Sequence, residues 1–176
     1  MTVLTTARLT LKPVTAEDFD DQLALWGDAD FTRYVMGRSL GAEEVWTRTL
    51  RDIGHWAVVG HGNWSMRLTD GGAYVGSVGV LDYRREIKPP FDAPELGWGI
   101  GTAFQGLGLA REGLEAVLAW IDAELKAART VCMIGLENAA SFKLAERVGY
   151  RPYGEALYHG NTVTLLERPN GGVASH

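Results

Sequence analysis

A run of small residues joins a short apolar strand to the longest amphipathic stretch of this sequence, and that order admits few folds. Between Gly108 and Leu125, apolar side chains recur at helical spacing, which predicts a helix with one buried face. The preceding stretch, Glu95 to Ile100, is predicted to be a strand. A strand that turns into a helix through glycines is typical of a β-α unit, so the sequence indicates a mixed α and β architecture. The apolar stripe of the helix consists of Leu114, Val117, Leu118, Ile121 and Leu125.

The other periodicities place strands and helices on both sides of this unit. Two helices are predicted near the N-terminus, one capped by Thr15 and one over Glu43 to Trp56. Three prolines and mixed charges make Asp82 to Pro94 a predicted surface loop. The second helix is expected to bury a stripe made of Val45, Trp46, Thr49, Leu50 and Ile53. The other predicted strands and the last helix cover Arg8 to Pro13, Trp64 to Leu68, Tyr74 to Leu81, Thr130 to Leu136, Asn138 to Arg147, the region of Tyr150, and Thr162 to Glu167.

Length and composition fit a single globular unit. At 176 residues, 46% of them hydrophobic, the chain can bury one core, and we expect one domain over residues 1–168 with a polar tail over 169–176. The net charge of -5 disfavours nucleic acid and anionic lipid as partners. No apolar run approaches the roughly 20 residues that span a bilayer, and no secretory signal pattern is found. With Cys132 as the only cysteine, the cytoplasm is the expected compartment.

The small residues at the entrance of the long helix favour an anion-binding site. A helix N-terminus exposes backbone N–H groups that lack intrahelical acceptors, and the helix dipole favours negative charge there. Gly106, Gly108 and Ala110 leave room for a diphosphate at these N–H groups. Arg111 can add a charged hydrogen bond. A tight strand-to-helix turn without any ligand would use the same glycines.

Two familiar phosphate-binding motifs do not fit these letters. A P-loop requires Gly-Lys followed by Ser or Thr, whereas Leu107 and Leu109 follow the two glycines. A dinucleotide fingerprint that begins at Gly106 requires Gly or Ala at the position of Arg111. Both classes of nucleotide site are therefore excluded.

The motif Gln105-x-x-Gly108-x-Ala110, after a strand and at the start of a long helix, resembles the signature of the GNAT superfamily of acyl-CoA-dependent N-acetyltransferases. Asn138-x-x-Ser141 and the later Gly149-Tyr150 pair are similar to the branch that contains the ribosomal-protein-alanine N-acetyltransferases. The resemblance covers nearly the whole chain. It implies an α/β (α+β) fold, with a mixed, mostly antiparallel central sheet, splayed parallel strands and helices on both faces.

The resemblance also implies acetyl-CoA as the cosubstrate and no metal. Pantetheine is expected in the gap between two splayed strands, Glu95 to Ile100 and Val131 to Leu136. Gly97 and Gly99 fit a bulged strand that stops pairing with its neighbour. The residues implied in cofactor binding are Trp98, Gly99 and Ile100 for pantetheine, Gln105, Gly106, Leu107, Gly108, Leu109, Ala110 and Arg111 for pyrophosphate, and Asn138 and Ser141 near the thiol.

The implied reaction is direct transfer of an acetyl group to a primary amine, which must lose a proton before it attacks. Glu95, at the start of the splayed strand, is the candidate catalytic base, and a solvated carboxylate at a strand end is the alternative interpretation. Many relatives use a tyrosine of the last helix as the acid, but Ala145 stands at that position. Ser141 is therefore the candidate proton donor to the departing thiolate, or else a cofactor contact or helix cap.

Other reactive side chains receive structural interpretations. Because direct transfer needs no covalent enzyme intermediate, Cys132 is interpreted as a buried strand residue. No His or acidic cluster has metal-ligand spacing, and His55 and His61 are interpreted as surface residues.

The amine acceptor is expected opposite the cofactor, between the first two helices and the Asp82 to Pro94 loop. It can be a protein N-terminus or a small-molecule amine. A non-catalytic acyl-CoA-binding sensor on the same fold is the alternative function, and a homodimer is compatible with the sequence. Candidate lining residues are Phe31, Tyr34, Trp56, Tyr83 and Phe91, and Arg84, Arg85 and Lys88 are candidate contacts for an acidic acceptor.

Overall fold

The computed structural model describes residues 1–171, and the remaining part of the expected tail, 172–176, lies outside the described residues. Within residues 1–171, nine strands form one sheet in the order β1-β2-β3-β4-β6-β7-β9-β8-β5. Neighbouring strands are antiparallel except β6 and β7, which are parallel. The strands are β1 (Leu4–Thr5), β2 (Leu9–Pro13), β3 (Asn63–Leu68), β4 (Tyr74–Leu81), β5 (Ile87–Lys88), β6 (Glu95–Ile100), β7 (Arg129–Gly135), β8 (Arg151–Tyr158) and β9 (Asn161–Pro169).

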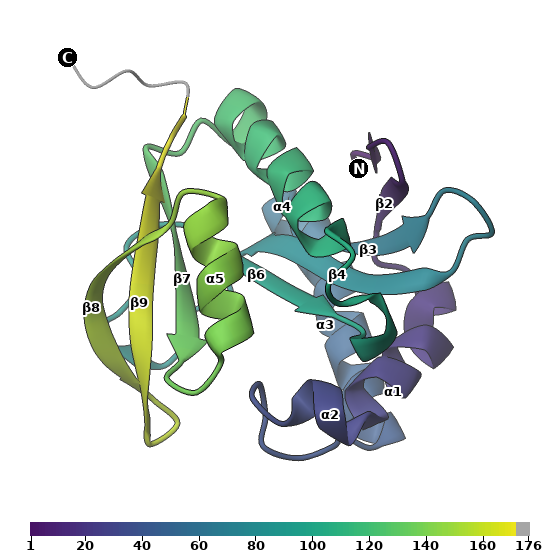
Figure 1. Ribbon diagram of the computed structural model, residues 1–176, viewed down its shortest axis with the longest axis horizontal. Coiled ribbons are helices and arrows are strands. Elements are labelled where there is room, and N and C mark those ends of the chain that lie inside the picture. The colour runs from purple at the N-terminus through teal and green to yellow at the C-terminus, as the bar shows by residue number, and fades with distance from the viewer. Residues whose placement is uncertain (172–176) are drawn as a thin grey trace.

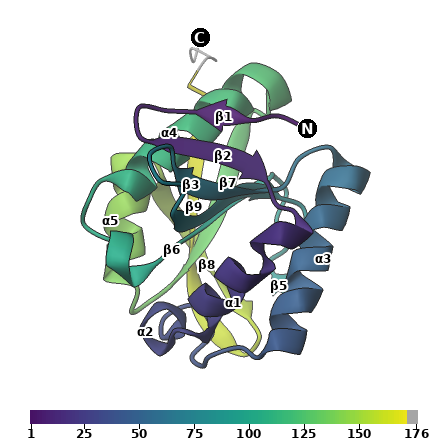
Figure 2. The ribbon, with the colours of Figure 1, turned by 90° about the vertical axis from the view of Figure 1, so that its right-hand side faces the viewer.

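Helices cover both faces of this sheet, as the resemblance implies. α4 and α5 lie on one face, and α1, α2 and α3 lie on the other (Figures 1 and 2). Mixed topology, a mostly antiparallel sheet and this layering confirm the expected fold class. The helical segments are η1 (Ala16–Asp18), α1 (Phe19–Gly27), α2 (Ala29–Thr32), α3 (Ala42–Val59), η2 (Thr102–Phe104), α4 (Leu109–Trp120), the π-helical turn η3 (Ile121–Leu125) and α5 (Ala139–Arg147).

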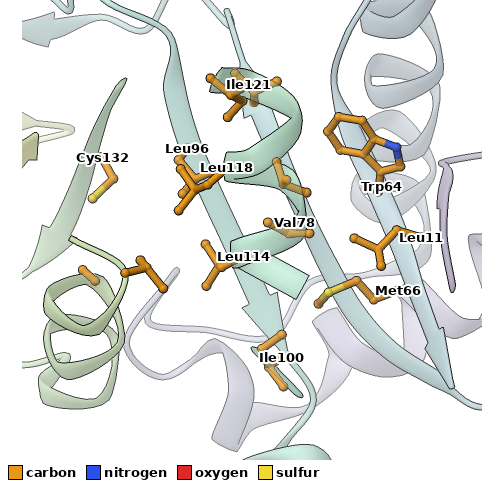
Figure 3. Close-up of a cluster of buried hydrophobic side chains, with 14 of the residues drawn as sticks. Leu11, Trp64, Met66, Val78, Leu96, Ile100, Leu114, Leu118, Ile121 and Cys132 are labelled. Carbon is orange, nitrogen blue, oxygen red and sulfur yellow. The ribbon is translucent and has the colours of Figure 1, made fainter. Parts of the chain in front are cut away.

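Buried side chains hold α4 against the centre of the sheet. Leu114, Leu118 and Ile121 pack with Leu96 and Ile100 of β6 in one cluster (Figure 3). None of these five side chains is more than 7% exposed, and each contributes about 1.5–3 kcal/mol when it is fully buried. The predicted stripe is confirmed, and it fixes the start of α4 relative to the end of β6.

Strands β6 and β7 separate directly after they meet, which confirms the expected splay. Their register contains one pair, Glu95 with Val131. Beyond this pair, β6 continues to pair with β4 and β7 continues to pair with β9. The sheet therefore holds a gap between two strands that are each supported on their other side.

The expected bulge in β6 is wrong. β6 keeps a regular register with β4 along its whole length. Gly97 and Gly99 serve close packing instead, because a Cβ atom would lie 2.9 Å from Leu81 at Gly97 and 2.8 Å from Phe31 at Gly99. Both strands keep regular registers with their outer neighbours, so the splay does not need an irregularity in β6.

Segment 82–94 contains a strand that the sequence did not indicate. β5 pairs with Leu157 and Tyr158 of β8, at the opposite half of the sheet from β4. Ile87 of β5 packs with Leu165 of β9, whereas the adjacent Leu166 belongs to the cluster that contains residues of α5. Adjacent strand residues point to opposite faces of a sheet. Segment 82–94 and α5 therefore cover opposite faces of the half of the sheet that contains β8 and β9.

Helix α3 buries only part of the expected stripe, because Val45 and Thr49 are fully buried but two other members are not. Trp46 and Leu50 are 41% and 50% exposed, whereas Asp52 and His55 are buried. Both polar side chains are hydrogen-bonded: Asp52 accepts a bond from the Tyr83 hydroxyl at 2.6 Å, and His55 accepts one from a backbone N–H at 2.9 Å. A prediction from apolar spacing alone does not identify a buried helix face when that face contains polar side chains that are hydrogen-bonded in the folded protein.

The C-terminal strand is longer than expected. β9 extends to Pro169, and the buried Asn170 donates its backbone N–H to the Ala128 carbonyl at 2.9 Å. β9 therefore extends two residues beyond the predicted strand end at Glu167.

Candidate active site

Gly106 and Gly108 shape the segment that precedes α4. Their φ values are +76° and +77°, in the left-handed region that glycine adopts without a Cβ clash. The first intrahelical bond runs from the Glu112 N–H to the Gly108 carbonyl at 3.1 Å. Within residues 1–171, none of the backbone N–H groups of residues 106 to 111 donates to a protein acceptor. These groups form a continuous row of free donors at the positive end of the helix.

Arg8, directly before β2, supports this loop. Its guanidinium donates to the Leu107 carbonyl at 2.9 Å and pairs with Glu112 at 2.7 Å. The pairing spans 104 residues of chain, so no local pattern in the sequence could have indicated it. Arg111 differs from its predicted role, because its guanidinium pairs with Glu115 at 2.7 Å, one turn along α4 and away from the loop.

The splay turns main-chain groups of β6 toward the gap. Hydrogen bonds alternate between the two sides of a strand, and the Gly101 N–H bonds β4 at 2.9 Å. Trp98 and Ile100 therefore direct their backbone groups toward the β7 side, whereas Gly99 directs its groups toward β4. The predicted main-chain contact through Gly99 does not fit this geometry. The Ile100 carbonyl accepts a bond from the Gln105 side chain at 3.2 Å. The N–H of Ile100 and the N–H and carbonyl of Trp98 therefore remain the main-chain groups that face the gap.

Glu95 lies where β6 and β7 still pair. Its side chain is on the face of the sheet opposite α4, because Leu96 points toward α4. It is 5% exposed, so the interpretation as a solvated carboxylate is wrong. Arg85 donates to Glu95 at 2.5 Å and to the Tyr158 hydroxyl at 2.9 Å. Burial raises the pKa of Glu95 although Arg85 acts to lower it.

A cavity of about 310 Å³ opens beside Glu95. Its walls come mainly from segment 82–94, and they include Tyr83, Arg84, Arg85 and Phe91. The cavity and Glu95 lie on the same face of the sheet, opposite the face of α4 and α5. An acidic side chain with a raised pKa therefore borders a space that is separated from the α4 loop by the sheet.

The N-terminus of α5 lies over the gap between β6 and β7 (Figure 1). Asn138 caps this helix, because its side-chain oxygen accepts the N–H of Ser141 at 3.2 Å. The Ser141 hydroxyl has no hydrogen-bond partner in the described chain. Ala145 is fully buried in the core, so a larger phenolic side chain has no room there without repacking.

Sequence and structure comparisons agree on one family. A family model described as an acetyltransferase (GNAT) domain matches residues 8–151. The chain belongs to the GNAT family. It is an acyltransferase enzyme, and the family uses acetyl-CoA.

Solved structures extend the likeness over the whole GNAT chain. An acetyltransferase described as GnaT-family, from Bordetella pertussis, is 33% identical, with a TM-score of 0.84 and coverage of 96% of this chain and 99% of that chain. The ribosomal-protein-S5-alanine acetyltransferase from Vibrio fischeri is 16% identical, with a TM-score of 0.78 and coverage of 99% and 100%. RimL, a ribosomal L7/L12 alpha-N-protein acetyltransferase in complex with coenzyme A, is 17% identical, with a TM-score of 0.77 and coverage of 96% and 98%. The last two share the fold.

The structure separates the aromatic residues predicted to line the acceptor approach of this GNAT enzyme. Tyr83 and Phe91 line the cavity beside Glu95, and Phe31 packs at Gly99 of β6. Trp56 is instead a core residue, 5% exposed, with its ring centroid 4.7 Å from that of Trp64.

The structure places the two histidines in the interior of the GNAT domain. His55 and His61 are buried, so their interpretation as surface residues is wrong. Each ring bonds to main chain, and the bond from the His61 ring to the Val80 carbonyl is 2.8 Å long. Cys132 is buried in β7 as expected, and burial raises the pKa of its thiol.

Two searches of residues 1–171 gave negative results. No helix there is both long enough and apolar enough to cross a membrane. No group of three or more His, Cys, Asp or Glu side chains in the same residues has an arrangement suited to a metal ion.

The cap at α5 predicts a modest effect on stability. Asn138→Ala removes the acceptor of the Ser141 N–H, and we expect the free energy of unfolding in urea to fall by about 1 kcal/mol. Asn161→Ala, at an exposed strand end, is the control. An equal loss in both variants would contradict a capping role for Asn138.

Proposed function

We propose that this GNAT chain transfers an acetyl group directly from acetyl-CoA to a primary amine, within the single domain that residues 1–168 were expected to form. The observation that carries the proposal is the row of free N–H groups from residue 106 to residue 111. It lies where β6 ends and α4 begins. A diphosphate at this position would supply acceptors to donors that the fold leaves unused.

Each part of the cosubstrate has candidate contacts. The main chain of Gln105, Gly106, Leu107, Gly108, Leu109, Ala110 and Arg111 is proposed to hold the pyrophosphate. Trp98 and Ile100 are proposed to bond pantetheine through their main chain, and Asn138 and Ser141 to contact it near the thiol. The coenzyme A complex of RimL, which has the same fold, supports this choice of cosubstrate. Acetyl-CoA supplies a thioester, whose acyl group is open to attack by a neutral amine.

Glu95 is proposed to remove the proton from the amine. A primary ammonium group with a pKa of about 8 to 10.4 is mostly charged at pH 7, so a base that holds its proton more tightly than an ordinary glutamate is suited to the task. Burial raises the pKa of Glu95 in this direction. Its position on the cavity side of the sheet lets a water or an amine approach it without crossing the α4 loop.

Ser141 is proposed to donate a proton to the departing thiolate. Its hydroxyl has no protein partner among residues 1–171, and it lies one turn before Ala145 on α5. Glu95, which takes the proton from the amine, and Ser141, which gives a proton to the sulfur, then lie on opposite faces of the sheet. This division fits an acceptor that enters beside Glu95 and a cosubstrate that enters beside α4.

The acceptor class that we propose is a primary amine at a protein N-terminus or on a small molecule. Two structural neighbours are named as acetyltransferases of ribosomal proteins, which supports the first choice. The cavity beside Glu95, of about 310 Å³, suits either an extended N-terminal residue or a compact small amine.

The decisive experiment separates an enzyme from a non-catalytic acyl-CoA sensor. Calorimetry with acetyl-CoA measures binding, and release of free thiol with a panel of primary amines measures transfer. We expect binding together with thiol release that depends on an amine. Binding without thiol release from any amine or N-terminal peptide would favour the sensor, and absence of binding would refute the proposed cofactor site.

A further inference from the structure

Arg48 is a partly buried cation that forms no hydrogen bond or close ion pair with a carboxylate of residues 1–171, although Glu44 and Asp52 lie near enough to interact with its charge. It projects from α3 with its guanidinium 4.2 Å from the centre of the Trp26 ring. Its hydrogen bond in the described chain goes to the sulfur of Met36, at 3.5 Å. The nearby Glu44 is held by Arg38 through two bonds of 2.6 and 3.0 Å. Arg48 therefore keeps donors that no acidic residue of the described chain satisfies.

Two other arginines, Arg51 and Arg85, lie close enough to act on the charge of Arg48. Arg51 and Arg85 lie 4.0 and 5.2 Å from the ring of Tyr83. Asp52 pairs with Arg51, and Glu95 pairs with Arg85, so these two positive charges are compensated. Burial lowers the pKa of Arg48, and Arg51 and Arg85 lower it further, while Asp52 acts in the opposite direction. An anion that reached Arg48 would relieve this unfavourable environment.

The surroundings of Arg48 belong to the acceptor face of the sheet. Trp26, under the guanidinium, packs edge-to-face on Phe31 at 5.1 Å. Phe31 in turn packs on Gly99 of β6, the strand that carries Glu95. Arg48 also interacts electrostatically with Tyr83, which lines the cavity beside Glu95. Arg48 itself lines a separate hollow together with Met36, Leu40, Glu43 and Glu44, on the side of the sheet where the amine acceptor is proposed to enter.

We propose that Arg48 binds a carboxylate of the acceptor, so that this enzyme acetylates amines that carry a carboxylate near the amino group. The inference rests on the proposed function and adds the substrate class to it. An arginine holds a carboxylate through paired N–H donors, which is a stronger and more oriented contact than a neutral hydrogen bond. Among the three arginines whose charges interact here, Arg51 and Arg85 are already paired with carboxylates, so Arg48 is the one that we assign to the acceptor carboxylate.

The test compares acceptors that differ only in this charge. In the first pair, tyrosine carries the carboxylate and tyramine lacks it. In the second pair, Ala-Glu-Ala amide carries a carboxylate on its second residue and Ala-Gln-Ala amide does not. Binding of each acceptor to the protein loaded with coenzyme A is measured by calorimetry, and KM and kcat are measured by thiol release. Arg48→Gln is the test variant. Arg33→Gln is the matched control, because Arg33 forms an exposed pair with Asp30.

We expect the acidic member of at least one pair to bind and react with a Kd and a KM roughly tenfold to a hundredfold lower. Arg48→Gln should abolish this preference with little change in kcat, and Arg33→Gln should keep it. Equal affinity for both members of both pairs in the natural protein, or a preference that survives in Arg48→Gln, would overturn the inference. Preferential binding of the acidic member without any acetyl transfer would support the carboxylate site and would refute the proposed reaction instead.

Discussion

Replacement of Gly108 by glutamate should raise the Kd for acetyl-CoA by roughly a hundredfold or more. Hydrogen bonds to a charged group are worth about 1.5–3 kcal/mol each, so loss of two of them from the row of donors is sufficient for this effect. The new carboxylate would also stand where the diphosphate is proposed to bind. Calorimetric titration with acetyl-CoA is the direct measurement.

A control variant separates this effect from backbone strain. The φ of Gly108 is +77°, and a side chain in that region costs about 1–2 kcal/mol. Gly71→Glu introduces the same side chain at a φ of +78°, in open space in the turn between β3 and β4. Both variants should lose similar stability, and only Gly108→Glu should lose the cosubstrate. Unchanged affinity in Gly108→Glu would refute the α4 loop as the diphosphate site.

Replacement of Glu95 by glutamine should lower kcat by roughly a hundredfold or more, which is the usual contribution of a general base. Glutamine keeps the shape of the side chain and can still accept a hydrogen bond from Arg85. The Kd for acetyl-CoA should stay within about twofold of the natural value, because the diphosphate is proposed to bind at the far end of β6. Asp92→Asn, which weakens an exposed pair with Arg129, is the matched control in the same segment. Full activity of Glu95→Gln would mean that another group removes the proton.

The pH dependence of kcat/KM tests the same role for Glu95. Burial raises the pKa of Glu95 above its ordinary value of 4.5, and only the ionised form can accept a proton. Activity should therefore be lost as the pH falls through this raised pKa, at a midpoint above 4.5. The Glu95→Gln variant should lack this acid limb. An acid limb of the same midpoint in the variant would assign it to another group.

Local features of the sequence predicted α4, α5 and the turn that precedes α4. The apolar stripe from Leu114 to Ile121 identifies α4 because its members recur at helical spacing. Gly106 and Gly108 mark the turn before it, since both adopt positive φ. Asn138 and Gly149 correctly bracket α5, as a cap whose oxygen accepts a backbone N–H and as a residue with a φ of +98°.

The face of the sheet that carries Glu95 was much less predictable, because its contacts join distant parts of the chain. β5 is two residues long and pairs with residues 157 and 158, so no local periodicity indicates it. The partner of Glu95 lies ten residues earlier, in a segment that resembles an ordinary surface loop. Asp52 and His55 are polar and yet buried, which an apolar pattern cannot anticipate. A hydrogen-bond network is visible only after the fold has brought its members together.

Segment 82–94 has a consequence for the order in which the protein can assemble during synthesis. The loop before α4 takes its support from Arg8 and Glu112, which have both left the ribosome well before the chain is complete. β5, by contrast, has no partner strand until residues 157 and 158 have emerged. The nascent protein can therefore complete the loop that is proposed to hold the diphosphate first, and it acquires the wall of the cavity beside Glu95 only with its final hairpin.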